Sequence, residues 1–396
     1  MPTRRSFFSG LTKDTFLLAF TSFFSDISTE MLYPVLPIFL TQTLGVSTSI
    51  VGLIEGIAPA IQNIVQGFSG SLADKLKKRK WIAFTGYAIS ALSKPFIGFS
   101  TAWTGVLAAR SVDRFGTGTR SAPRDALIAS SADAANRGKA FGLEGIGDNL
   151  GAFVGPLVAI ALLSIFHVSL RSIFWLAIIP GSLAVLMILF VHERKETEIA
   201  AKADLTLRKF PKNYWIYLLV TALFGIGNST NAFLILRTQN LGVPLTITIL
   251  IYAFYNFVAA AASYPAGHLS DVLGRKGVLL LAFLLAAIVY AGFGFLQNVI
   301  LIGFLFIMYG AYQGIFRAVG KALAIDLVPA SMRASGVGWY TATIGLTGLI
   351  ASFVGGLLWS AFGPQATFLY GMLSSLIGSV ALLLFIPRQN YSTADS

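Results

Sequence analysis

The chain repeats itself at a fixed offset, and this feature constrains its fold more than any other. Thr41–Val46 reads Thr-Gln-Thr-Leu-Gly-Val and returns at Thr238–Val243 as Thr-Gln-Asn-Leu-Gly-Val. Gly70–Asp74 returns at the same offset, 197 residues, as Gly267–Asp271, and the whole chain has 396 residues. Both matches stand at the ends of long apolar segments. Two coincidences at one offset of half the chain length indicate that an ancestral helical bundle was duplicated and fused.

The composition indicates that lipid, rather than water, solvates most of this bundle. The chain is 55% apolar and 12% charged, whereas about 25% of the residues of an ordinary soluble domain are charged. A helix needs about 20 apolar residues to cross the hydrocarbon layer, and the chain holds twelve apolar segments near that length, six in each half. The expected spans are residues 15–40, 48–72, 81–101, 103–121, 138–165, 170–191, 213–236, 244–268, 277–297, 299–325, 334–361 and 365–386.

The expected fold class is therefore an all-α membrane protein with twelve transmembrane helices in two pseudo-symmetric six-helix bundles. We expect residues 1–191 to form the N-terminal bundle and 213–396 the C-terminal bundle, with 192–212 as a cytoplasmic linker. Fused repeats of this kind are typical of secondary transporters whose halves rock about a shared central site.

The net charge of +12 is explained by its position along the chain. Lys and Arg gather before the first span and in the loops after spans 2, 6, 8, 10 and 12, while the alternate loops carry almost none. This positive-inside pattern places both termini in the cytoplasm, so the basic charge needs no nucleic-acid partner. The first apolar segment is too long for a cleavable signal peptide and precedes no small-residue cleavage site, so we expect it to remain as the first span.

The sequence also excludes several kinds of chemistry. It has no cysteine, and His167, His192 and His268 show no metal-ligand spacing. There is no Walker loop, no nucleophile elbow and no dinucleotide fingerprint after a strand. We therefore expect no catalytic residue, no metal and no cofactor, and an ion gradient as the source of energy.

The repeated loop resembles the signature of the major facilitator superfamily, Gly-x-Leu-x-Asp followed by basic residues. The first copy is Gly70–Asp74 with the basic run Lys75–Lys80, and the second is Gly267–Asp271 followed by Arg275 and Lys276. The half-length repeat, the twelve spans and the long central loop extend this resemblance over the whole chain. The resemblance implies a transporter that works by alternating access.

The two acids of this signature are candidate gating residues. An anion at the end of a helix can lie against the positive N-terminal end of another helix. Pseudo-symmetry pairs Asp74 with the helix that starts near Ala334, and Asp271 with the helix that starts near Gly138. The alternative is that each is a solvated loop acid beside positive-inside lysines.

A second resemblance lies in the fifth span. Gly142, Gly151, Gly155 and Pro156 match the Gly-x8-Gly-x3-Gly-Pro pattern of drug/proton antiporters of the superfamily. The match implies an exporter, although small residues also serve simple helix packing, and the proline loosens the turn before it.

Acidic residues at membrane depth are costly and are functional candidates. Asp26 and Glu30 stand four residues apart, on one face of the first span. The repeat maps them onto Leu223 and Gly227, so the second half has no equivalent acids. This asymmetry favours proton coupling at Asp26 and Glu30, because a buried carboxyl can load and release a proton as access alternates.

Two further residues complete the predicted coupling site. Asp148 in the fifth span is a secondary candidate, and Arg114 in the fourth span is the expected partner that sets the protonation of the acids. The alternative is that the acids are permanently paired with Arg110, Arg114 or Arg120.

Candidate gating and cavity residues follow from the remaining polar positions. Arg124 and Asp125, at the cytoplasmic end of the fourth span, are expected to gate that side. Spans 1, 4, 7 and 10 line the cavity in the superfamily, so polar residues of spans 7 and 10 are expected to bind substrate, or else to bond helices together. These are Asn228, Asn231, Tyr309, Tyr312, Gln313 and Arg317.

The sequence thus predicts a proton-coupled secondary transporter that exports small amphipathic organic compounds. One alternative is proton-driven uptake of an organic acid or a metal-chelating metabolite, and another is a non-transporting membrane receptor or scaffold. The expected partners are the small-molecule substrate, protons and the lipid bilayer. We expect a monomer in the bacterial cytoplasmic (inner) membrane with both termini in the cytoplasm.

Overall fold

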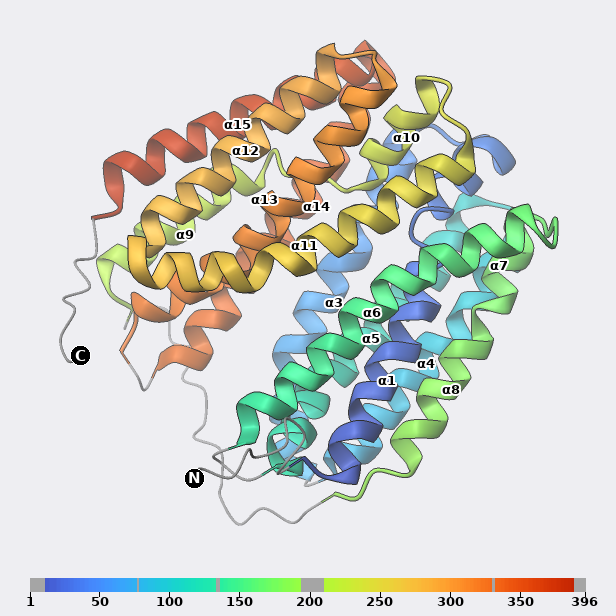
Figure 1. Cartoon of the computed structure of the whole chain (residues 1–396), viewed down its shortest axis with the longest axis vertical. Helices are drawn as coiled ribbons and strands as arrows, with labels where there is room; N and C mark the ends of the chain where they lie inside the picture. Colours follow the sequence, from blue (N-terminus) through green and yellow to red (C-terminus); the bar gives the residue numbers. More distant parts are fainter. Residues whose placement is uncertain (1–10, 77, 133–135, 194–209, 330–331, 388–396) are drawn as a thin grey trace, which may run out of the picture. The chain divides into compact units, whose positions relative to one another are not determined.

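The structure, a computed structural model, is helical throughout the residues that it describes. These are residues 11–76, 78–132, 136–193, 210–329 and 332–387, without the side chains of residues 71, 72, 74, 75 and 334. No strand occurs among them. The chain divides into two compact units (Figure 1).

Unit 1 comprises Met1–Leu32 and Ile64–Ala201. Within it, α1 packs mainly on α6 and α8, and α4 packs on α5 (Figure 1). Its helices are α1 (Lys13–Glu30), the end of α3 (Thr48–Leu76), α4 (Arg79–Phe99), α5 (Trp103–Ser131), α6 (Arg137–Ser164), α7 (Leu170–Leu176) and α8 (Ile178–Leu189).

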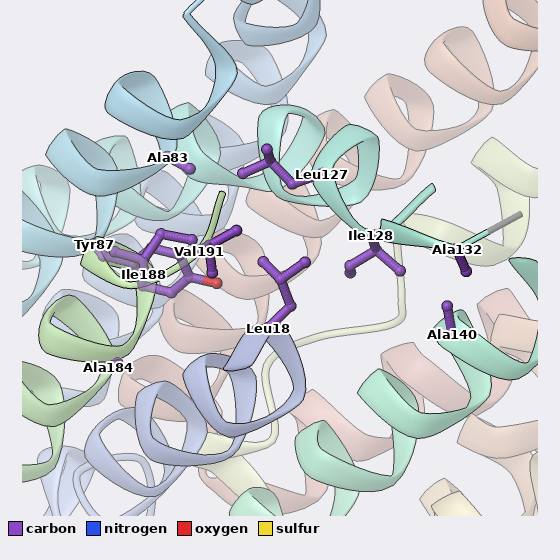
Figure 2. Close-up of a cluster of buried hydrophobic side chains, with 10 residues drawn as sticks. All are labelled: Leu18, Ala83, Tyr87, Leu127, Ile128, Ala132, Ala140, Ala184, Ile188 and Val191. Carbon is purple, nitrogen blue, oxygen red and sulfur yellow. The ribbon is translucent and has the colours of Figure 1, made fainter. Parts of the chain in front are cut away.

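A buried apolar cluster holds one end of unit 1 together (Figure 2). Leu18 of α1 lies among side chains from the beginnings of α4 and α6 and from the ends of α5 and α8. Helices that run in alternate directions bring these ends to one level. The members are Leu18, Ala83, Tyr87, Leu127, Ile128, Ala132, Ala140, Ala184, Ile188 and Val191.

Unit 2 comprises Tyr33–Asn63 and Lys202–Ser396. Stacked aromatic rings form part of its core, with Phe224 and Phe283 only 3.9 Å apart between ring centroids. Its elements are α2 (Leu36–Ile38), the π-helix η1 (Phe39–Thr43), the beginning of α3, α9 (Lys212–Gly225), α10 (Ala232–Asn240), α11 (Leu245–Leu273), α12 (Arg275–Phe295), α13 (Val299–Asp326), α14 (Arg333–Phe362) and α15 (Pro364–Phe385).

The first half of α3 belongs to unit 2 because it packs closely on α14. The Ser49 hydroxyl donates to Ser360 Oγ at 2.7 Å and contacts the Gly356 carbonyl oxygen at 3.2 Å. A Cβ atom on Gly56 would lie 2.9 Å from a Leu349 methyl group, so the glycine is what permits this approach. The unit boundary therefore falls inside α3, while the expected division at 191 and 213 remains a prediction.

Eight of the described helices are long and apolar enough to cross a membrane. Among the other expected spans, α4 carries Lys94 and α5 carries five charged residues between Arg110 and Arg124, which lowers their hydropathy. The first and seventh expected spans are each interrupted, because α1 ends at Glu30 and α9 ends at Gly225. The eight segments are Thr48–Gly70, Arg137–Ser164, Leu170–Leu189, Leu245–Leu273, Arg275–Phe295, Val299–Asp326, Ser335–Phe362 and Pro364–Phe385.

Candidate functional site

The first span of each half is broken at the same place in the repeat. The helix α1 ends at Glu30, and Pro34 and Pro37 follow, which lack the N–H groups that would continue the helical ladder. The helix α9 ends at Gly225, and α10 begins only at Ala232. Position 30 corresponds to position 227 at the offset of 197. Interrupted spans at corresponding positions of two repeats point to the binding region of a transporter.

In unit 1, two carboxyl groups meet beside the break in α1. The Asp26 side chain of α1 is hydrogen-bonded to the Asp148 side chain of α6. A carboxylate only accepts hydrogen bonds, so a bond between two carboxyl groups requires a proton on one of them. Glu30, one turn further along α1, adds its charge to the surroundings of Asp26. The structure thus brings together the three predicted acids.

Glycines of α6 make this meeting possible. A Cβ atom on Gly151 would lie 2.5 Å from the Phe23 carbonyl oxygen and 2.8 Å from Asp26 Cβ, and one on Gly155 would lie 3.0 Å from Glu30 Cβ. Gly147, which the sequence analysis did not single out, is equally close to the backbone of α1. Of the predicted motif, Pro156 is buried inside α6, whereas Gly142 has nothing within 4 Å.

The arginine whose charge acts on Asp26 is Arg120, whereas the sequence predicts Arg114 as its partner. Arg120 acts electrostatically on Asp26, donates to Ser25 Oγ, and lies 4.2 Å above the Tyr87 ring. Arg114 lies 3.5 Å from Asp113. Asp113 also binds Arg110 at 3.1 Å and accepts from the Ser90 hydroxyl at 2.6 Å. Asp113 therefore faces two guanidinium groups, whereas Asp26 faces another carboxyl group.

The predicted gating pair Arg124 and Asp125 is joined by an ion pair of 2.9 Å. Arg124 also binds Glu144 of α6 at 3.0 Å, and Glu144 accepts from the Ser22 hydroxyl of α1 at 2.7 Å. These contacts connect α1, α5 and α6 within unit 1. Glu144 was not selected from the sequence, although its spacing of four from Asp148 places both on one face of α6.

Lys94 is the charged residue that the sequence analysis missed most clearly. It lies on α4 with 1% of its surface exposed, and its ammonium donates to Ser28 Oγ at 2.7 Å and to Thr29 Oγ1 at 3.1 Å. A lone lysine within an apolar span is itself an unusual and costly feature. That signal was available in the sequence.

In unit 2, the predicted cavity residues form a network of amides and tyrosines. Tyr309 of α13 donates to Asn231 Oδ1 at 2.7 Å, and Asn231 donates to the Tyr255 hydroxyl at 3.1 Å. Gln313 donates to the Tyr309 hydroxyl at 3.0 Å, and Tyr290 donates to Asn228 Oδ1 at 2.9 Å. Tyr255 and Tyr290 were not selected, because no periodicity marks a tyrosine as facing the break in span 7.

Aromatic rings continue this network. The rings of Tyr33 and Tyr252 stack at 6.0 Å, those of Tyr255 and Tyr309 lie 5.4 Å apart, and Tyr309 and Tyr312 are also 5.4 Å apart. The buried Tyr312 hydroxyl has no hydrogen-bond partner among the residues that the structure describes. Unit 2 thus presents neutral polar atoms among aromatic faces.

The predicted gating residue Asp271 lies in a chain of ion pairs within unit 2. Asp271 binds Arg275 at 2.7 Å, and Arg275 binds Asp326 of α13 at 3.1 Å. Arg317 is exposed. The side chain of Asp74 lies outside the described residues.

No metal site accompanies these networks in the described part of the chain, where no group of three or more His, Asp or Glu side chains could hold an ion. The chemistry that the described residues offer is proton binding by carboxyl groups in unit 1 and hydrogen bonding by amides and tyrosine hydroxyls in unit 2.

Comparison with known sequences places both halves in one family. The sequence profile described as Major Facilitator Superfamily matches residues 18–236 and 217–395. An uncharacterized MFS-type transporter of Methanocaldococcus jannaschii is 35% identical over 385 residues, 95% of each chain. The separate match of the profile to each half agrees with the repeat.

More distant relatives carry named substrates or effects. A probable 4-methylmuconolactone transporter of Cupriavidus pinatubonensis is 27% identical and covers 83% of this chain and 79% of its own length. The quinolone resistance protein NorA of Staphylococcus aureus is 27% identical over 52% of each chain.

A solved structure shares the fold at low identity. A mutant of the nucleoside transporter NupG matches with a TM-score of 0.82 over 95% of this chain and 100% of its own, at 15% identity. The predicted fold class, an all-α membrane protein of the major facilitator type, is confirmed.

Proposed function

This chain belongs to the major facilitator superfamily of membrane transporters, and we propose that it couples the export of small amphipathic organic compounds to proton entry. In this proposal residues 1–191 and 213–396 are the two bundles, with both termini in the cytoplasm of a bacterial cell. The functional unit is a monomer.

The observation that carries the proposal is the hydrogen bond between Asp26 and Asp148. It gives unit 1 a place for one exchangeable proton beside the break in span 1. The repeat supports a specialised role, because position 26 corresponds to Leu223 in the second half. A bundle that needed acids only for packing would carry them in both halves.

The coupling step then follows from charge. When the pair holds its proton, the two carboxyls are bonded and carry one negative charge, which Arg120 offsets. When the proton leaves, two negative charges face each other across α1 and α6, and their repulsion favours a different arrangement of these helices. Proton binding and release thus bias the two access states, which is what coupling requires.

Substrate class and direction rest on other features. The tyrosines and amides of unit 2 suit compounds with an aromatic or apolar body and few polar groups. Export is supported by the fifth-span pattern Gly151, Gly155 and Pro156 and by the likeness to a quinolone resistance protein. The second candidate is proton-driven uptake of an organic acid, and the likeness to a probable 4-methylmuconolactone transporter supports a lactone or related compound as its substrate.

Transport in proteoliposomes tests the proposal. Protein is reconstituted with a panel of probes that contains ethidium, a quinolone and a lactone, and a pH gradient of either sign is imposed. We expect a probe to move against its gradient when protons flow in the opposite direction, and to stop when an ionophore collapses the pH difference. Movement with the protons would establish uptake, and movement that ignores the pH difference would contradict proton coupling.

A further inference from the structure

The helix α1 presents three serines to three basic side chains of unit 1. Ser22, Ser25 and Ser28 follow at a spacing of three, so they descend one face of the helix. Each hydroxyl accepts a hydrogen bond from a cation on a neighbouring helix. The donors are Arg124 (3.4 Å), Arg120 and Lys94 (2.7 Å), respectively.

Lys94 differs from the two arginines in its surroundings. No carboxylate of the described residues lies within ion-pair distance of its ammonium, whose contacts are the hydroxyls of Ser28 and Thr29. Ser28 gives its own proton to the Ala177 carbonyl oxygen at 2.6 Å, so toward Lys94 it can only accept. Arg124, by contrast, has two carboxylate partners.

The charges that act on Lys94 come from two of the helices around it. From α5 these are Asp113, Arg114 and Arg120, and from α1 it is Asp26. The Asp113 charge is already bound by Arg110 and Arg114. The helices α7 and α8 also pack on α4, but α8 has no ionisable side chain, and Arg171 of α7 bonds the carbonyl groups at the end of α4.

A buried cation with only neutral hydrogen-bond partners is costly. A lysine can remove that cost by releasing its proton, whereas an arginine cannot. The Thr29 hydroxyl can serve either form, because it can accept from an ammonium or donate to a neutral amine. The site is therefore built to hold both protonation states of Lys94.

We propose that Lys94 is a second proton-binding group of the transport cycle, which binds and releases its own proton in addition to the one held by the Asp26–Asp148 pair. This inference rests on the proposed proton coupling. In one state the pair is protonated and Lys94 is a neutral amine. In the other, Lys94 has bound a proton from water, so –NH2 becomes –NH3⁺ and unit 1 gains one positive charge. The two states then differ by one bound proton, and their populations depend on pH.

The competing explanation is that Lys94 is a permanent positive brace between α1 and α4. The two explanations differ for Lys94→Arg, which keeps the charge and the donors but cannot release a proton. A brace tolerates that change. A proton-binding group does not, whereas Lys94→Gln imitates the neutral form.

The experiment needs no substrate. Spin labels on Thr101→Cys and Gln297→Cys, both exposed and in a chain without native cysteine, report the distance distribution between units 1 and 2 from pH 5 to pH 9. We expect the wild type to change population with pH, Lys94→Arg to lose that change, and Lys94→Gln to stay in the population seen when the amine is neutral. Lys212→Arg, at an exposed lysine, is the matched control and should behave as the wild type.

The outcomes separate this inference from the proposed function. If Lys94→Arg keeps the pH response of the wild type, Lys94 is a brace, and proton coupling through Asp26 stands. If the populations of the wild type itself do not change with pH, both the proton-binding role of Lys94 and the proposed proton coupling are contradicted. Should the variants fold poorly, the ¹³Cε resonance of Lys94 in the wild type, identified by its absence from either variant, must titrate in this pH range; a resonance that stays at the ammonium position overturns the inference.

Discussion

At the scale of single residues, carboxyl groups of unit 1 occupy three different environments. Asp113 is surrounded by two guanidinium groups and a serine hydroxyl, and Glu144 by Arg124 and Ser22. Asp26 alone among these three is bonded to another carboxyl group. Asp113 and Glu144 therefore face cations, while the Asp26–Asp148 pair can share a proton.

This difference predicts opposite effects of two amide substitutions on stability. Asp26→Asn can donate a hydrogen bond to Asp148 and so imitates the protonated pair, and the melting temperature should remain close to that of the wild type. Glu144→Gln removes the anion that binds Arg124 and should cost on the order of 2 kcal/mol, the usual range for hydrogen bonds to charged groups. Thermal unfolding in detergent measures both; equal losses for the two variants would show that Asp26 is a fixed anion as well.

At the scale of helices, the close packing of α6 on α1 decides whether the acids meet. Gly147, Gly151 and Gly155 stand four residues apart and place the backbone of α1 against α6. Part of this was predictable: the sequence pattern identified Gly151 and Gly155. The pattern also included Gly142, where an added Cβ atom would meet no neighbour, and it omitted Gly147. A motif defined by spacing does not reveal which face of a helix is covered.

Alanine substitutions along α6 test this packing. Gly151→Ala places a methyl group against Phe23 and Asp26, so it should separate the two carboxyl groups, lower the melting temperature and reduce coupled transport. Gly142→Ala is the matched control: with no atom within 4 Å, it should be neutral or slightly stabilising, since alanine favours a helix by about 1 kcal/mol over glycine. If the two variants behave alike, the glycines do not set the distance between α1 and α6.

The contact of α3 with α14 in unit 2 provides a second test at this scale. Ser49 and Ser360 are joined directly through their side chains at 2.7 Å. Changing both to cysteine should allow an oxidant to link them, and the link should stop transport until a reductant is added, because alternating access requires these helices to separate at this end. The single variants should be unaffected by oxidant. A linked protein that still transports would place the moving contact elsewhere.

The sequence predicted the membrane spans but not their interruptions, and the reason is physical. Hydropathy and charge defined the spans, since lipid demands long apolar helices. The interruptions of spans 1 and 7 were not predicted. Pro34 and Pro37 lie within an apolar run, so the hydropathy stays high where the helical hydrogen bonds are interrupted. The surroundings of Lys94 could not be predicted, because its hydroxyl partners Ser28 and Thr29 lie on α1, a helix distant in sequence.

At the scale of the whole molecule, the repeat predicts topology as well as fold. Corresponding loops of the two halves should face the same side of the membrane, and the positive-inside pattern makes that side external for Gln42 and its counterpart Gln239. Because the chain has no cysteine, Gln42→Cys can be labelled without background. An impermeant thiol reagent should label it in intact cells; labelling only after the cells are opened would invert the predicted topology.

The two halves differ in chemistry: in the proposed mechanism unit 1 binds the proton, and unit 2 supplies neutral polar and aromatic groups. This division explains why the repeat has kept loop signatures in both halves but acids of the first span in only one. It also assigns proton coupling to unit 1 and substrate binding to unit 2, so a substitution can remove coupling while the protein still binds substrate.

The most direct measurement is transport by the Asp26→Asn variant in proteoliposomes, compared with the wild type and with Asp14→Asn, an acid at the start of the same helix. With a probe that the wild type transports, we expect Asp26→Asn to lose movement driven by an imposed pH gradient while it still exchanges the probe across the membrane at equal pH. Asp14→Asn should retain both activities. Gradient-driven transport that persists in Asp26→Asn, and in the combination of Asp26→Asn with Asp148→Asn, would contradict the account.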